Sequence, residues 1–433
     1  MLYILNKAKD QDTKWLRLDN AAKIYPASAN PKRPLVFRLM TEIDRPVNLG
    51  ILKKALEETI ARYPYFGVQI HKGFFWYWMD FESPGVSIYP DLGTPCRYFR
   101  YRQREQPQVR LLVKNNTISA EFFHALTDGS GALTFMRHLI FAYARILGIN
   151  LPEGSDNPLD SVPDSEENED AYNRYFDPKL PPPPKLSKAF HLPFLKLNSF
   201  SYKLLSCEIP TGRLLEAARE NGLTITEYLS AIYLWALQDI YLKLYPSNNN
   251  RQKRPVIRVQ VPVNLRNLFP SKTLRNFTLF VVPEIDTRLG YYSFEEICRL
   301  VHYHMLLETD PKLLRRIIYR NVRNEKSIFI RIIPLTLKNI VLRYYFHRSG
   351  LSLYSGLITN LGRVQWPGEL SEFVTGMRFY PPPPDQTKVS LGVVTSNNRL
   401  ILTFGNTSYS KWIEKAVIGF MVEKNIPVKI LNV

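Results

Sequence analysis

The stretch 117–144 constrains this chain most, because a strand pattern gives way to a helix pattern within it. Apolar and polar residues alternate over 117–123, as in a strand with one buried face. From Ala132 to Ala144 the apolar residues recur at intervals of three and four, which predicts a helix that begins near Ser130. His124 therefore stands where rigid structure ends and a short loop begins.

His124 is followed at the fourth position by Asp128 and then by Gly129. A neutral imidazole titrates near pH 7 and can take a proton from a hydroxyl, an amine or a thiol. Asp128 is expected to orient the loop or the ring, and Gly129 to allow backbone angles that other residues resist. The triplet alone is a pattern of low specificity, and a single histidine at a strand end is more often a packed or surface residue.

The string HALTDGSGAL, from His124 to Leu133, resembles the active-site motif of the chloramphenicol-acetyltransferase-like superfamily, which includes peptide-synthetase condensation domains and alcohol acetyltransferases. The resemblance is closest to the alcohol acetyltransferase group. Condensation domains usually carry two adjacent histidines, and this chain has Phe123 in the first place. Further stretches agree with the family in the family's order, at 18–26, 261–266, 274–277 and 359–362.

The resemblance implies an α/β (α+β) fold of two lobes, each a mixed sheet covered by helices, joined into a V with His124 in a central channel. The expected division is an N-terminal lobe at 1–151 with the motif and a C-terminal lobe at 191–433. The segment 152–190 between them is rich in acidic residues and includes four consecutive prolines. We expect it to be a partly extended linker, too polar to build a core.

The same resemblance implies an acyltransferase that uses acyl-CoA as co-substrate and holds no permanent cofactor and no metal. His124 would deprotonate a hydroxyl or amine of a small-molecule or lipid-like acceptor, which attacks the thioester directly, so that no covalent acyl-enzyme forms. The acyl group would be acetyl or longer. Two alternatives remain open: a condensation-type enzyme that takes its acyl group from a carrier protein, and a non-catalytic scaffold of the same fold.

The motif positions of the resemblance give further candidate site residues in the second half of the chain. Arg266 and Arg275 either contact the phosphates of coenzyme A or form structural ion pairs. Asn276 and nearby backbone amides are candidate donors to the oxyanion, against a packing role. The partner of Asp128 is also open, with Arg62 and Arg266 as the candidates.

Half of the net charge of +18 lies between Lys312 and Arg348, a segment with ten lysines and arginines and one acidic residue, Glu325. The residues between them are mainly aliphatic and aromatic, which indicates amphipathic helices and not a nucleic-acid-binding tail. A solvated helical face is the simplest interpretation. More specific interpretations are contact of 312–348 with an anionic membrane surface, with the phosphates of coenzyme A or, for a condensation-type enzyme, with an acidic carrier protein. We expect a monomer that binds no nucleic acid.

The sequence argues against several other classes of protein. The apolar part of the opening residues is too short for a signal peptide, and no stretch reaches the length of a membrane span. We therefore expect a cytoplasmic protein and leave peripheral contact with a membrane open. The cysteines are widely spaced, and the pair His302 and His304 lacks a third ligand, so no disulfide framework or metal site is expected. The aromatic run 74–78 is interpreted as sheet core or, less simply, as a channel wall.

Overall fold

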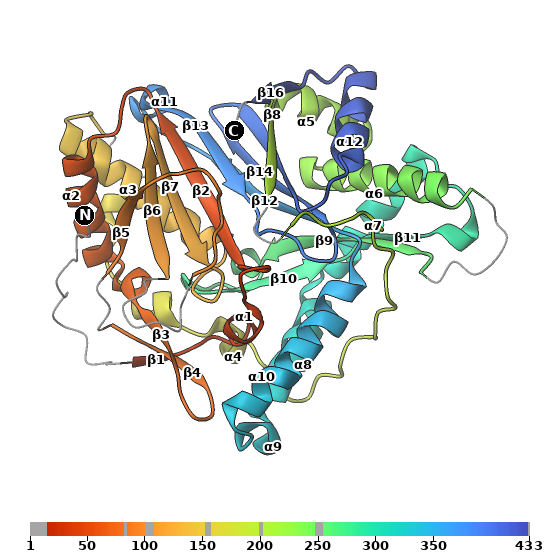
Figure 1. The fold of residues 1–433 in the computed structure, drawn as a ribbon, viewed down its shortest axis with the longest axis horizontal. Helices are drawn as coiled ribbons and strands as arrows, with labels where there is room; N and C mark the ends of the chain where they lie inside the picture. Colours follow the sequence, from red (N-terminus) through yellow and green to blue (C-terminus); the bar gives the residue numbers. More distant parts are fainter. Residues whose placement is uncertain are drawn as a thin grey trace.

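The computed structural model describes residues 15–81, 85–99, 108–151, 157–198, 202–246 and 254–431 (Figure 1). The strands are β1 (Trp15–Arg17), β2 (Val36–Ile43), β3 (Gln69–Lys72), β4 (Tyr77–Asp80), β5 (Ser87–Pro90), β6 (Val109–Lys114), β7 (Thr117–Phe123), β8 (Lys203–Pro210), β9 (Val256–Asn264), β10 (Thr278–Val281), β11 (Glu284–Asp286), β12 (Gly356–Val364), β13 (Val374–Tyr380), β14 (Val389–Ser396), β15 (Arg399–Asn406) and β16 (Lys429–Leu431).

The α-helices of the described residues vary from single turns to twenty residues. They are α1 (Ile24–Ser28), α2 (Leu49–Arg62), α3 (Gly129–Leu147), α4 (Ala171–Arg174), α5 (Thr211–Glu220), α6 (Ile225–Leu244), α7 (Phe294–Glu308), α8 (Pro311–Lys326), α9 (Ile328–Arg331), α10 (Leu335–Tyr345), α11 (Leu370–Phe373) and α12 (Trp412–Glu423). None of the described helices is both long and apolar enough to cross a bilayer.

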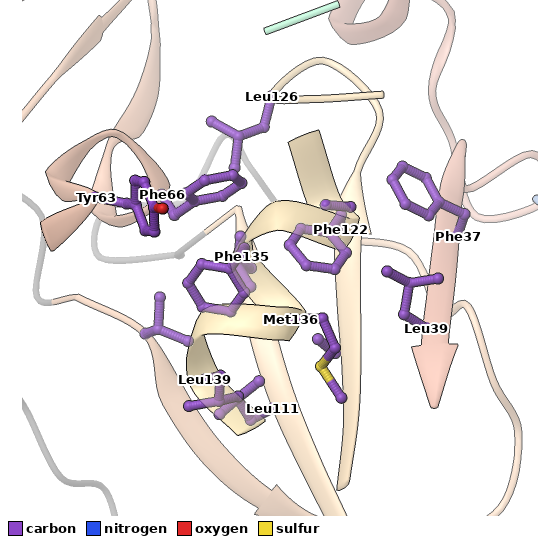
Figure 2. Packing of buried hydrophobic residues seen from close by; sticks show 14 of the residues in the cluster. Phe37, Leu39, Tyr63, Phe66, Leu111, Phe122, Leu126, Phe135, Met136 and Leu139 are labelled. Atoms are coloured by element: carbon purple, nitrogen blue, oxygen red, sulfur yellow. The ribbon is translucent and has the colours of Figure 1, made fainter. Parts of the chain in front are cut away.

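The first half of the chain builds a five-stranded sheet in the order β13-β2-β7-β6-β5, with α2 and α3 beside it (Figure 1). The strand predicted over 117–123 is confirmed as β7. It pairs antiparallel with β6 in a hairpin that leads to His124, and Asn115 in the turn has a φ of 50°. Figure 2 shows Phe122 of β7 packed with Phe135 of α3, whose ring also lies 4.8 Å from that of Phe66. This aromatic core fixes the strand that carries the histidine against the helix that follows it.

The second half builds a larger mixed sheet in the order β10-β9-β12-β14-β15-β8-β16, with β11 paired to β9. Helices α5, α6, α7 and α12 lie on one side of it (Figure 1). Asn397 and Asn398 form the turn between β14 and β15 and both have positive φ values, 48° and 58°. A capping box of Thr224 and Glu227 opens α6.

One strand of the second half belongs to the sheet of the first half. β13 pairs antiparallel with β2, with Met377 opposite Thr41 and Phe379 opposite Leu39. The sheet that carries His124 is therefore completed by residues more than two hundred positions further along the chain.

The segment 152–190, expected to be a linker too polar to build a core, contributes to a shared core in its central part. Tyr172 of α4 is buried in a hydrophobic cluster with Phe277 and Leu314 of the second half. The acidic residue Glu167 nearby forms an ion pair with Arg62 at 2.6 Å. A few apolar side chains, next to acidic residues that are paired with arginines, are enough to dock the segment on the rest of the protein. Residues 152–156 lie outside the described part of the chain.

The aromatic run 74–78 does not lie wholly in the core, as the simpler interpretation required. Tyr77 is buried, but Phe74 and Phe75 are exposed at the tip of the hairpin between β3 and β4. These two strands and β1 form a separate small sheet, which covers only part of the run.

Candidate active site

His124 is the one residue from Ile118 to Asp128 that keeps access to solvent, since every other residue of this run is buried. Its backbone N–H donates to the carbonyl of Leu35 at 2.9 Å, which continues the pairing of β7 with the strand beside it. Tyr25 of α1 stacks on the imidazole with centroids 4.7 Å apart, and Phe37 of β2 meets it edge-on at 5.2 Å. The ring is held on two sides by aromatic side chains.

Asn276 fixes the tautomer of His124. The amide Nδ2 of Asn276 is 3.1 Å from the His124 carbonyl and 3.3 Å from Oδ2 of Asp19, two groups that act as acceptors. The amide oxygen Oδ1 must then face the ring, where it lies 3.2 Å from Nδ1 of His124. Because Oδ1 is an acceptor, Nδ1 carries the proton and Nε2 is left with a lone pair.

Asp19 supports this arrangement from the buried end of the motif at 18–26. It is fully buried, accepts from the backbone N–H of Ala22 at 2.7 Å, and has the Nε of Arg275 at 3.7 Å. Burial raises the pKa of Asp19 to about 6, although the charge of Arg275 acts in the opposite direction. Asp19, Asn276 and His124 thus form one connected polar chain that ends at the imidazole.

The surroundings favour the neutral form of His124. Burial of the ring lowers the pKa of His124 below its ordinary value of 6.5, and its own backbone carbonyl, the charge of Asp128 and the Asn276 amide only partly offset this effect. At neutral pH the imidazole is therefore uncharged, as a general base must be.

Asp128 orients the loop and not the ring. It caps α3 by accepting from the N–H of Gly131 at 3.1 Å, and it also accepts from the N–H of Phe277 at 2.8 Å and the hydroxyl of Thr278 at 2.9 Å. Arg266 pairs with the carboxylate at 2.9 Å. Asp128 therefore ties the motif loop to the second half of the chain.

Of the two candidate partners of Asp128, the structure selects Arg266. Arg62 binds Glu167 and the Val162 carbonyl instead. Burial raises the pKa of Asp128, but the charge and hydrogen bonds of Arg266 and the backbone donors outweigh it, and the pKa stays below its ordinary value. The carboxylate is charged at neutral pH.

Arg275 lies inside the protein, where it forms the structural ion pair that the sequence left open. It is 3% exposed, it donates to the carbonyls of Asn168 and Arg17, and it lies beside Asp19. Its guanidinium group links the first strand of the chain, the segment before α4 and the loop that carries Asn276.

The glycines of the motif serve close packing and not unusual backbone angles, so the expectation for Gly129 is wrong. Gly129 and Gly131 do not have positive φ. A Cβ atom at Gly129 would run into the side chain of Leu361, and one at Gly131 would run into the carbonyl of Leu274. Both contacts come from the second half, so the small residues let the two halves meet at the motif.

His302, one of the two closely spaced histidines, contacts a glutamate of a neighbouring helix. His302 lies on α7 and bonds to Glu227 at 3.1 Å. Within the described ranges, no group of three or more His, Cys, Asp or Glu side chains could hold a metal ion.

Sequence reasoning did not assign roles to Tyr25 and Asp19, although both lie in the motif at 18–26. Their part depends on contact with His124 and Asn276, which are more than ninety residues away. The local sequence gives one signal for Asp19: it is an aspartate among apolar residues, in a segment that Pro26 soon interrupts.

No family model matches this chain, and no curated protein matches it in sequence. Its structure, however, is similar to solved ones. TRI101 of F. graminearum, in complex with coenzyme A and deoxynivalenol, matches with a TM-score of 0.65 at 9% identity, over 97% of this chain and 100% of that chain. TRI3 trichothecene 15-O-acetyltransferase from Fusarium sporotrichioides matches with a TM-score of 0.62 at 12% identity, over 96% of each chain.

The condensation domain of the monacolin K polyketide synthase MokA is also similar, with a TM-score of 0.57 at 12% identity, over 95% of this chain and 96% of that chain. An acetyltransferase, a protein in complex with coenzyme A and a condensation domain thus share the architecture of this chain over nearly their full lengths. The fold that the resemblance implies is confirmed: the chain has the two-lobed α/β fold that these solved structures share.

Proposed function

We propose that the protein transfers an acyl group from coenzyme A to a hydroxyl or amine of a small-molecule or lipid-like acceptor, with His124 as general base. The contact that carries this proposal is the one between Nδ1 of His124 and Oδ1 of Asn276, at 3.2 Å. It places the ring proton on Nδ1 and leaves Nε2 able to accept a proton. The fold, which is shared with an acetyltransferase and with a protein solved in complex with coenzyme A, supports the same reaction class.

In the proposed reaction the acceptor hydroxyl or amine gives its proton to Nε2 as its oxygen or nitrogen bonds to the thioester carbonyl carbon. The tetrahedral intermediate then collapses, and its carbon–sulfur bond breaks. The imidazolium returns the proton to the leaving thiolate, so that free coenzyme A and the acylated acceptor are released. His124 ends in its starting state, and no acyl-enzyme forms.

The remaining candidate residues take positioning roles in this proposal. The NH2 group of Asn276 is directed at Asp19 and the His124 carbonyl, so we assign Asn276 to the ring of His124 and not to the oxyanion. Arg266 and Arg275 hold Asp128 and Asp19, so we assign them to the site's framework and not to the phosphates of coenzyme A.

The experiment that tests the function is incubation with acetyl-CoA and longer acyl-CoAs and a mixed panel of alcohols and amines, followed by mass spectrometry of the acceptors. We expect at least one acceptor to gain the mass of the acyl group. A parallel reaction with acyl groups on a carrier protein tests the condensation-type alternative. Transfer from the carrier alone would replace coenzyme A as donor, and no transfer from either donor would favour the scaffold.

Replacing Asn276 with alanine should lower kcat by about ten- to a hundredfold, because His124 loses the group that fixes its tautomer and angle. KM should change little, since Asn276 is assigned no contact with substrate. Steady-state kinetics on folded protein separate the two constants. A rise in KM at constant kcat would instead assign Asn276 to substrate binding.

The rate should fall on the acid side only well below neutral pH. Protonation of His124 removes the base, and its lowered pKa moves the midpoint of the acid limb of kcat/KM below 6.5. Asp19 also titrates in this range, with a pKa of about 6, so Asp19→Asn is the control. The limb should persist in that variant, and its disappearance would assign the limb to Asp19.

A further inference from the structure

Helix α10 carries its apolar residues on the side that faces solvent. Leu337, Ile340, Val341 and Tyr344 recur at intervals of three and four residues, so they form one stripe along the helix. Each of the four side chains is between 56 and 63% exposed. In most surface helices the apolar stripe faces the core, whereas in α10 it faces solvent.

Two polar residues of α10, Lys338 and Asn339, face the protein, where the hairpin of β3 and β4 holds them. Lys338 and Asn339 are only 3% and 6% exposed. The ammonium group of Lys338 donates to the carbonyl of Phe75 at 2.9 Å and lies 3.5 Å from the centroid of the Trp76 ring. The amide of Asn339 donates to the hydroxyl of Tyr77 at 2.9 Å. These contacts fix the rotation of α10 and hence the outward direction of its apolar stripe.

Further exposed apolar side chains continue this surface. Helices α8 and α10 project from the body of the protein, and α9 forms their outer tip (Figure 1). The backbone N–H of Leu335 donates to the carbonyl of Phe74 at 2.8 Å, which places the hairpin tip at the start of α10. We call the set the α9–α10 face; its residues are Phe74, Ile328, Phe329, Ile332, Leu337, Ile340, Val341 and Tyr344.

The segment that forms this face is also strongly basic. No acidic residue occurs between Glu325 and Glu369, and Glu325 itself is engaged by Lys23 at 2.6 Å. Exposed basic side chains in α10 and close to α9 and α10 in the chain include Arg323, Lys326, Arg331, Arg343 and Arg348. A protruding apolar surface is thus combined with uncompensated positive charge.

We propose that the α9–α10 face docks on the surface of an anionic lipid membrane. Apolar and aromatic side chains at a projecting tip can enter the boundary between headgroups and acyl chains, while flanking arginines and lysines bind anionic headgroups. A second copy of the chain would bring two basic faces together, which like-charge repulsion opposes. The membrane contact expected for 312–348 is thereby narrowed to the exposed side of α9 and α10 and the adjoining hairpin tip.

The face lies close to the candidate active site. Arg343 of α10 donates to the carbonyl of Ala27 in α1 at 2.6 Å, and Tyr25 of the same short helix stacks on His124. Only α1 separates α10 from the imidazole along this path. Resting on the proposed function, this proximity favours a lipid-like acceptor that is taken up at the membrane.

Flotation of the purified full chain with vesicles tests the docking directly. Wild type should float with vesicles of phosphatidylcholine and phosphatidylserine, and much less with phosphatidylcholine alone. Leu337→Ser with Ile340→Ser should weaken binding at least about tenfold, because two large apolar side chains are lost. Arg323→Gln with Arg331→Gln should weaken binding to anionic vesicles only, by about fivefold for each charge.

The control is Leu195→Ser with Leu289→Ser, which replaces two leucines outside the face that are even more exposed, at 79% and 80%, and it should bind like wild type. Vesicle binding does not depend on acyl transfer. A negative flotation result would therefore overturn the docking proposal without bearing on the proposed function. Wild type that stays with the soluble fraction in both mixtures would overturn the proposal. So would a dimer that Leu337→Ser with Ile340→Ser dissociates, or binding to an acidic carrier protein in place of vesicles.

Discussion

His124→Ala should lower the rate of acyl transfer by about a thousandfold, within the range for loss of a positioned general base. The acceptor then has no group to take its proton as it attacks the thioester. Binding of acyl-CoA should persist, because His124 acts on the acceptor's proton and not on the nucleotide. Single-turnover rates together with a binding isotherm for acyl-CoA measure the two effects separately.

The His124→Ala variant should remain folded. The ring is partly exposed, and the backbone N–H that bonds to Leu35 is retained. Unfolding by denaturant should therefore show a cooperative transition near that of wild type. A folded variant that keeps the wild-type rate would remove His124 from the mechanism.

Asp128→Ala should lower the free energy of unfolding by about 3–5 kcal/mol, the cost of leaving one member of a buried ion pair without the other. Arg266 would lose its carboxylate partner, and the N–H of Phe277 and the hydroxyl of Thr278 would lose their acceptor. Activity should fall with stability, since this carboxylate holds the loop between His124 and α3. Denaturant titration at neutral pH measures the effect.

The pH dependence of wild-type stability also reports the contribution of the Asp128 carboxylate. The pKa of Asp128 is below its ordinary value of 3.8 in the folded protein. The stability that it contributes is therefore present above pH 3.8 and is lost as the pH falls through the folded-state pKa. Asp128→Ala should lack this part of the acid dependence.

The control for Asp128→Ala is Glu216→Ala, which breaks an exposed pair with Arg213 on α5. It should change the free energy of unfolding by less than about 1 kcal/mol, as exposed ion pairs generally do. Equal losses in the two variants would show that the buried pair between Asp128 and Arg266 has no special weight.

Local patterns predicted the element that carries the site. The alternation over 117–123, the two asparagines before it and the glycines after Asp128 specify a hairpin, a loop and a helix through nearest-neighbour geometry alone. The start of α3 at Gly129 lies one residue from the predicted position. Such features depend on residues within a few positions of one another, which a sequence displays directly.

The partners of the motif could not be predicted with the same certainty, because they come from distant segments. The contact between His124 and Asn276 spans 152 positions, and Arg62 and Arg266 were equally plausible partners of Asp128 before packing selected one. The placement of β13 beside β2 is likewise a result of lobe packing. None of these contacts leaves a periodic trace in the sequence.

Helix α10 shows the same limit in another form. Its sequence predicts an amphipathic helix, and periodicity alone would turn Leu337 and Ile340 toward the core. The hydrogen bonds of Lys338 and Asn339 to the hairpin decide the opposite orientation. Amphipathicity fixes which residues share a side of a helix, whereas tertiary contacts fix where that side points.

The most direct test of the central claim is free-thiol release from acyl-CoA by wild type and His124→Ala, side by side, with and without the acceptor panel. We predict release that requires an acceptor and is lost in the variant. Release at the same rate in both proteins, or no release by folded wild type with any acyl-CoA, would contradict a coenzyme A-dependent acyltransferase with His124 as its base.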